Sequence, residues 1–171
     1  MIQRCTTAHI APRTAWLGAL ALVAALGLAA PAAWAADTSP SPSAAPDKLA
    51  AARDLIQQDK WVAAIEELKR VDDRSSADWN NLMGYSHRKA KVPDYAAAER
   101  YYNEALRIDP KHKGALEYSG ELYLMLNQLP QAEARLAVLD KVCMLPCAEY
   151  TDLKSAIARY KANGNSYVAK P

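Results

Sequence analysis

The chain of 171 residues contains no phenylalanine, only six glycines and only three cysteines. So few cysteines cannot form a dense disulfide framework, and a chain of this length can bury a core without one. Only four glycines follow residue 35, and they form no glycine-rich phosphate loop. Charged residues make up 23% of the chain and the formal net charge is +2, which indicates neither wholesale disorder nor charge-driven binding of nucleic acid.

The first 35 residues lack aspartate and glutamate, and Arg4 and Arg13 are their only basic residues. An uninterrupted apolar run of 15 residues extends from Trp16 to Ala30, and a small-residue motif ends at Ala35. This pattern is typical of a secretory signal peptide, and the run is shorter than the roughly 20 residues of a membrane span. We predict a signal peptide over residues 1–35, cleaved after Ala35, and a periplasmic mature chain; an uncleaved anchor is the alternative.

Removal of residues 1–35 leaves 19 basic and 19 acidic residues, so the mature chain is formally neutral. Residues 36–46 include three prolines and three serines, a composition that favours extended backbone and leaves little to pack. We therefore predict a linker over residues 36–46 and a folded part that begins near Asp47.

The folded part repeats with a period of 34 residues. Four positions of similar type recur three times each: Trp61, Tyr95 and Leu129; Ala64, Ala98 and Ala132; Leu68, Tyr102 and Leu136; Val71, Ala105 and Leu139. Within each copy the apolar residues follow steps of three and four, which is the period of a helix, and no segment alternates as a half-buried strand does. The sequence predicts an all-α domain with two helices in each copy.

Polar residues mark where several helices begin. We expect Ser75 or Ser76 to cap the helix that contains Trp79, and Asp94 to cap the next helix. Asp109 is expected to cap a helix that starts at Pro110, with the proline in its first turn.

These copies resemble the tetratricopeptide repeat family, whose unit is a 34-residue helix–turn–helix. The second copy carries the resemblance through Trp79, Leu82 or Met83, Gly84, Ala98, Tyr102, Ala105 and Pro110, and the third through Leu116, Gly120, Tyr123, Ala132, Leu136 and Leu139. The resemblance implies a right-handed α-solenoid of about three repeats over residues 47–142, divided into 47–76, 77–110 and 111–142. We expect a Cys-x3-Cys turn and a capping helix over residues 143–164, and a loose tail over residues 165–171.

The two glycines of the signature, Gly84 and Gly120, are expected where helices approach closely, so that larger side chains would clash. They are separated by 36 residues instead of 34. We interpret Val92 and Pro93 as a two-residue insertion in the turn between helices, balanced by a shorter loop after Val71.

The family resemblance also implies that the first helix of each pair lines a concave face that binds a protein segment. The residues expected on this face are Arg53, Gln57, Asn81, Tyr85, Arg88, Lys89, Glu117, Glu121, Leu124 and Met125. They do not reproduce the basic and asparagine pattern with which some relatives clamp a terminal carboxylate. The function implied is a non-catalytic protein–protein interaction module of the cell envelope, with no cofactor, metal, nucleic acid or stable membrane insertion after signal cleavage.

Cys143 and Cys147 are the two cysteines left after signal cleavage, and an oxidising compartment favours their pairing. A structural disulfide is the leading interpretation. Free or redox-labile thiols and a metal site are alternatives, and a small periplasmic dithiol redox protein would use the same pair. A purely structural, self-associating domain is a further alternative for the whole chain.

His87 and His112 lie among basic residues, and we expect both to face solvent. The local run of His87, Arg88, Lys89 and Lys91, extended by Lys111 and Lys113, is either a solvated helix end or a docking patch for an acidic partner or a phosphate-bearing polymer. No arrangement of serine, histidine and acidic residues predicts a catalytic site.

Overall fold

The computed structural model describes residues 47–168, which contain seven α-helices and no strand. The helices are α1 (Ala50–Gln57), α2 (Trp61–Val71), α3 (Ala77–Lys89), α4 (Tyr95–Ile108), α5 (Lys113–Met125), α6 (Leu129–Val142) and α7 (Ala148–Ala162). The predicted signal peptide and linker lie outside the described residues, as do residues 169–171.

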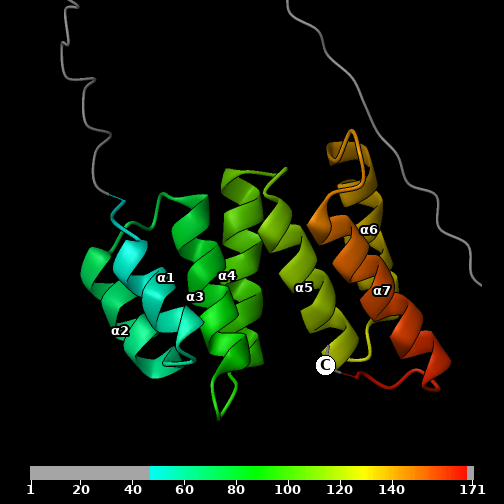
Figure 1. Ribbon diagram of the computed structural model, residues 1–171, viewed down its shortest axis with the longest axis horizontal. Helices are drawn as coiled ribbons and strands as arrows, with labels where there is room; N and C mark the ends of the chain where they lie inside the picture. The colour runs from blue at the N-terminus through cyan, green and yellow to red at the C-terminus, as the bar shows by residue number, and fades with distance from the viewer. Residues whose placement is uncertain (1–46, 169–171) are drawn as a thin grey trace, which may run out of the picture. The chain divides into compact units, whose positions relative to one another are not determined.

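The helices pack as successive pairs, α1 with α2, α3 with α4 and α5 with α6. The second helix of each pair also packs on the first helix of the next element, and the first helices contact one another in the order α1, α3, α5 and α7. Figure 1 shows the pairs in chain order, from α1 in cyan to α7 in orange. One pair cannot bury its own apolar face, so the core runs between pairs. The predicted all-α helical repeat is confirmed.

Helix α7 follows the third pair and packs against both α5 and α6. Its side chains Leu153, Ile157 and Tyr160 are buried in one core cluster with Leu116, Leu139 and other residues of those two helices. The opposite side of α7 carries exposed polar residues such as Lys154 and Ser155. The helix therefore covers the apolar flank of the third pair, as terminal elements of helical repeats do.

Two of the three predicted caps are confirmed. The Ser76 hydroxyl accepts a hydrogen bond from the Trp79 backbone N–H at 3.2 Å, and the Asp94 carboxylate accepts one from the Ala97 N–H at 2.8 Å. These contacts satisfy backbone donors that a helix start leaves without an intrahelical partner.

The third predicted cap is wrong. Asp109 does not start α5; its carboxylate accepts a hydrogen bond from the Lys111 N–H at 2.9 Å, which closes a local turn. The helix starts at Lys113, after His112, whose Nδ1 accepts a hydrogen bond from the Ala115 N–H at 3.1 Å. A side chain that bonds two residues ahead competes with helix initiation, so the start moves beyond Pro110.

The signature glycines lie where the sequence predicted close approach. A Cβ atom built on Gly84 would lie 2.8 Å from the Tyr102 ring of α4, and one on Gly120 would lie 2.6 Å from the Leu153 side chain of α7. Both distances are too short for any larger residue without movement of a buried neighbour.

The chain reverses after α7. Gly164 and Asn165 have φ angles of 64° and 61°, in the left-handed region that glycine and asparagine adopt most readily. Tyr167 then packs against the core cluster that contains Leu153 and Ile157. The prediction of a loose tail is therefore wrong at Tyr167, because its ring finds apolar surface on the repeats.

Candidate functional site

The first helices α1, α3, α5 and α7 lie next to one another, and together with Trp61 at the start of α2 they form a surface that we call the first-helix face. Near its middle, Arg88 of α3 donates a hydrogen bond to the Glu121 carboxylate of α5 at 2.7 Å. Arg88 is only 4% exposed, and its Nη1 also lies 3.9 Å from the Met125 sulfur. The pair joins the second repeat to the third with a charge-assisted hydrogen bond shielded from solvent.

Tyr102 lies beneath this ion pair and is fully buried. Burial raises the pKa of the Tyr102 hydroxyl, and Arg88 opposes that effect. The hydroxyl lies beside Arg88 without a hydrogen bond of regular geometry. Burial disfavours the charged form of Arg88, but Tyr102 and Glu121 outweigh that penalty and raise the pKa of its guanidinium. Arg88 is therefore a permanent buried cation.

Three half-buried aromatic rings form a row beside Arg88. The Trp61 ring of α2 lies 5.8 Å from the Tyr85 ring of α3, and the Tyr85 ring lies 4.6 Å from the Tyr118 ring of α5. The Arg88 guanidinium lies 5.4 Å from the centre of the Tyr85 ring and 5.6 Å from that of Tyr118, and the Lys89 ammonium lies 5.9 Å from that of Trp61. We call Trp61, Tyr85 and Tyr118 the aromatic row.

The Trp61 end of the aromatic row borders a hollow of about 480 Å³. The hollow lies between the start of α2 and the α3–α4 loop, and its walls include Lys60, Val62, Lys91 and Val92. Val62 is 71% exposed and Val92 is 87% exposed. Apolar side chains, with Lys60, Lys91 and Asp59 among the lining residues, therefore extend the row towards the α3–α4 loop.

Glu117 lies on the other side of Arg88, in α5, and is only 8% exposed. Burial, with the neighbouring carboxylates of Glu121, Asp152 and Glu149, raises the pKa of its carboxyl group to about 8, while Arg88 opposes them. A carboxyl group in this setting resists ionisation because several like charges face it in a poorly solvated place.

The structure gathers most of the predicted face residues around Arg88. Tyr85, Glu117, Glu121 and Met125 lie beside it or act on its charge. Lys89 is exposed and lies over Trp61. These residues form one continuous site.

Four predicted face residues lie elsewhere or differ from the expectation. Leu124 is fully buried in the core, because it points between α5 and its neighbours, so its inclusion was wrong. Asn81 is 7% exposed and packs near Gly114. Arg53 lies in α1 and forms ion pairs with Asp47 at 3.8 Å and Asp78 at 3.4 Å. Gln57, at the end of α1, is exposed.

The sequence predicted that both histidines face solvent, but each of them makes specific contacts in the structure. His87 is half-buried and stacks on the Tyr101 ring at 5.6 Å, and burial lowers the pKa of its imidazole. His112 caps α5 and its Nε2 lies 3.0 Å from the Asp78 carboxylate. The predicted basic run is also not a continuous patch, since Arg88 is buried between Lys89 and His87 and pairs with Glu121.

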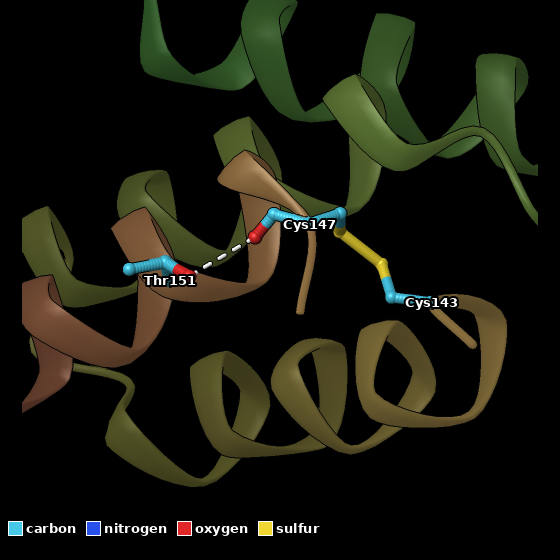
Figure 2. Close-up of a disulfide and its surroundings, with 3 residues drawn as sticks. All are labelled: Cys143, Cys147 and Thr151. Carbon is cyan, nitrogen blue, oxygen red and sulfur yellow. Dashed lines mark hydrogen bonds between the residues drawn. A yellow bond between two sulfur atoms is a disulfide. The ribbon is translucent and has the colours of Figure 1, made fainter. Parts of the chain in front are cut away.

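Cys143 and Cys147 form a disulfide with Cα atoms 5.8 Å apart, which confirms their predicted pairing. Figure 2 shows the bond between the end of α6 and the start of α7, where the Thr151 hydroxyl donates a hydrogen bond to the Cys147 carbonyl at 3.1 Å. Met144 and Leu145, between the cysteines, are 98% and 80% exposed. Residues 47–168 contain no group of histidine, cysteine and acidic residues suited to a metal ion.

Sequence reasoning missed Trp61 and Tyr118 as members of the site. The signal that points to Tyr118 was the repeat itself, since Tyr85 and Tyr118 are separated by 33 residues, as are Arg88 and Glu121. Asp78 and His112 are likewise separated by 34 residues. Corresponding positions on successive first helices come into contact. The repeat period therefore predicts which residues contact one another as well as where the helices lie.

Comparisons with known proteins agree with this architecture. The sequence model of the tetratricopeptide repeat family matches residues 93–157, which extend from the α3–α4 loop into α7. No curated protein and no solved structure matched the chain. Within residues 47–168, no helix has the length and apolar character needed to cross a membrane. Residues 93–157 therefore match the tetratricopeptide repeat family, and the paired helices of the fold agree with that match.

Proposed function

We propose that this chain is a non-catalytic protein-binding module of the cell envelope, which holds a segment of a partner protein on its first-helix face. Tetratricopeptide repeats generally mediate protein–protein interactions, and the family is typically non-catalytic. The proposal adds the face, its residues and the location.

The aromatic row is the observation that carries this proposal. Trp61, Tyr85 and Tyr118 stay partly exposed although they touch one another across three helices. Large rings and arginine supply most of the affinity of many protein interfaces, because they bury much area with little loss of side-chain freedom. Rings already fixed by their neighbours, with Arg88 held by Glu121, lose still less on binding.

The chemistry of the row indicates the kind of segment that fits. Apolar or aromatic side chains would pack on the rings and fill the hollow beside Trp61. Lys60, Lys89 and Lys91 outnumber Asp59 around that end, so the local charge favours a partner carboxylate nearby. We therefore propose a segment that combines apolar and acidic residues.

The pattern of residues 1–35, which is typical of a signal peptide, supports the proposed location. In the periplasm the Cys143–Cys147 bond would persist, since oxidising compartments preserve disulfides. We propose a structural role for this bond, because it fixes the turn between the third repeat and its capping helix. A redox role requires a reduction potential well above that of structural disulfides, which titration against a thiol couple measures.

Co-purification from cell-envelope extract tests the proposed face. We expect a tagged mature chain to retain a partner that is lost when Trp61→Ala is combined with Lys89→Glu. Both side chains lie at the surface, so the fold should survive their replacement, and circular dichroism checks that it does.

Lys69→Glu on α2 is the matched control, since Lys69 is exposed and pairs only with Glu66 of its own helix. The control should retain the partner. Loss of binding in both variants would point to net charge instead of the aromatic row, and retention in both would place the binding surface elsewhere.

A further inference from the structure

The turn between α6 and α7 presents two large apolar side chains to solvent, those of Met144 and Leu145, which we call the apolar tip. The disulfide between Cys143 and Cys147 closes the turn around them. The Cys143 N–H also donates a hydrogen bond to the Leu139 carbonyl at 2.9 Å, so the start of the turn is tied to α6. A tip that is already held in one shape loses little conformational freedom when it binds, which favours docking.

The hollow beside Trp61 is a concave surface of matching chemistry. Its volume of about 480 Å³ is large enough for several side chains, and its walls include the exposed side chains of Val62 and Val92. Among residues 47–168, these two valines and the two residues of the apolar tip are the four most exposed large apolar side chains. Contact between the tip and the hollow would remove all four from water at once, which the hydrophobic effect favours.

The apolar tip cannot reach the hollow of its own chain. The hollow lies between the start of α2 and the α3–α4 loop, whereas the tip lies in the α6–α7 turn. Figure 1 shows the α3–α4 loop at the lower end of the helices and the α6–α7 turn at the upper end. The two sites are therefore available only to other molecules.

The charges around the two sites are opposite, which points to a second copy as the occupant. The residues that line the hollow include two lysines and one aspartate: Lys60, Lys91 and Asp59. The stretch from residue 140 to residue 149, which contains the tip, has two acidic residues and one lysine: Asp140, Glu149 and Lys141. A net positive hollow and a net negative turn attract each other and orient the contact.

We propose that mature chains associate head to tail, with the apolar tip of one copy docked in the hollow of the next. This inference rests on the proposed function, because the tip with its acidic neighbours is a segment of the kind proposed to bind at that end of the first-helix face. The two surfaces differ, so each added copy leaves one tip and one hollow free, and the contacts extend into chains or close into rings. A contact centred on two side chains is small beside the roughly 1,200 Å² of a stable interface, so the association is weak.

Sedimentation equilibrium of the mature chain tests the proposal between about 10 μM and about 1 mM, where the average mass should rise with concentration. The tip variant combines Met144→Ser with Leu145→Ser, and the hollow variant combines Val62→Ser with Val92→Ser. Each should raise the apparent dissociation constant at least about tenfold, because it removes the apolar centre of the contact. All four side chains are strongly exposed, so the fold should survive, and circular dichroism checks that it does.

A mixture of the two variants distinguishes a head-to-tail contact from a symmetric one. The tip variant keeps its hollow and the hollow variant keeps its tip, so the mixture should form dimers with one copy of each that grow no further. If tips bound to tips instead, the hollow variant would associate on its own as strongly as the unchanged chain, and the proposal would be wrong.

Val138→Ser is the matched control, since it removes an exposed apolar side chain of α6 that belongs to neither site. It should associate as the unchanged chain does. A monomeric unchanged chain at about 1 mM overturns the proposal. If that monomer sediments with vesicles of phosphatidylethanolamine and phosphatidylglycerol and the tip variant does not, the tip binds a lipid surface instead of a second copy.

The two proposals fail in different ways. If an envelope partner depends on Trp61 and Lys89 but the chain stays monomeric, the head-to-tail contact is wrong and the partner face stands. If association depends on both the tip and the hollow but no partner depends on Trp61 and Lys89, the head-to-tail contact stands and the proposed partner face is wrong.

Discussion

The second and third helix pairs share a sequence pattern but complete their cores differently. In the second pair, Gly84 of α3 approaches Tyr102 of α4, so both sides of the contact belong to the same repeat. In the third pair, Gly120 of α5 approaches Leu153 of α7, which lies outside the repeat. Leu136 is the counterpart of Tyr102 and is only half-buried, whereas Tyr102 is fully buried. The third pair therefore depends on a helix that the repeat pattern does not contain.

The pairs also differ in the charge that they bury. The second pair buries Arg88, which is matched by Glu121 at 2.7 Å. The third buries Glu117, which faces Glu121, Asp152 and Glu149 and has a raised pKa. A matched charge holds its neighbours in place, whereas a carboxyl group among carboxylates is stable only while protonated.

Leu153→Ala should cause the largest loss of stability, because it removes the contact by which the third pair depends on α7. Leu153 is fully buried against Gly120, so its truncation leaves a cavity between α5 and α7 and should lower the free energy of unfolding by about 2–5 kcal/mol. Chemical denaturation measures the change. Lys154→Ala, at the exposed neighbouring position, should change stability by less than about 0.5 kcal/mol. Similar small effects for both would show that the third pair does not need α7.

The glycines sharpen the same point. Gly120→Leu should destabilise the chain by about 1–3 kcal/mol through overpacking, and Leu153→Ala should relieve part of that loss because it vacates the contacted volume. Gly84→Leu should be at least as damaging, since it meets the rigid Tyr102 ring, and Leu153→Ala should not relieve it. Thermal melts of the single and double variants measure this coupling, with Ala137→Leu on the exposed side of α6 as the control. Additive losses for Gly120 and Leu153 would contradict the contact.

The buried carboxyl group of Glu117 should make the stability of the chain depend on pH. Its pKa is about 8 in the folded chain and about 4.5 without the fold, so the folded state binds more protons between these values. The contribution of Glu117 to stability is therefore favourable at low pH and is lost as the pH rises from about 4.5 to 8. Glu117→Gln should stabilise the chain by about 1–3 kcal/mol at pH 9 and by less at pH 5.

Denaturation of the unchanged and Glu117→Gln chains at both pH values measures this effect. Glu133→Gln is a suitable comparison, because Glu133 lies in an exposed pair with Lys161. It should shift stability by similar small amounts at the two pH values. An unchanged pH dependence in the Glu117→Gln chain would show that another group is responsible.

The disulfide should have the smallest effect. Replacement of Cys143 and Cys147 with serine opens a loop of only five residues, so the loss in stability should be about 2 kcal/mol or less. Hydrogen exchange should show the loss at α6 and α7 and not at α3 and α4, because the bond joins only the former two helices. Reductant should lower the stability of the unchanged chain by the same amount and leave the serine variant unaffected.

Much of the fold could be predicted because it repeats. The recurrence of Ala64, Ala98 and Ala132 predicted the second helix of each pair. Ser76 and Asp94 predicted two helix starts, because each side chain bonds a backbone N–H only three residues ahead. Asp109 shows the limit of such rules. An aspartate before a proline can either cap a helix or close a turn. In the structure Asp109 closes a turn, and His112 caps the helix instead.

The candidate site was less predictable, because burial on a first helix depends on neighbouring repeats. Tyr85, Arg88 and Glu121 were expected on one face, but Arg88 is 4% exposed since Glu121 and two rings close over it. Leu124 was placed one position from Met125 on the same face, yet a rotation of about 100° per residue directs it into the core. Tyr167 lies after the last helix, where no periodicity indicates a contact.

The dependence of α5 on α7 sets an order of assembly. Most helices pack on elements next to them in the chain. Because synthesis proceeds from the N-terminus, the early helices can pack together before the later ones have been made. Gly120 of α5 differs, because its closest contact is with Leu153 of α7, two helices further along the chain. The third pair therefore keeps an open apolar flank until α7 is available, and a chain whose synthesis stops before α7 would leave that flank exposed to aggregation.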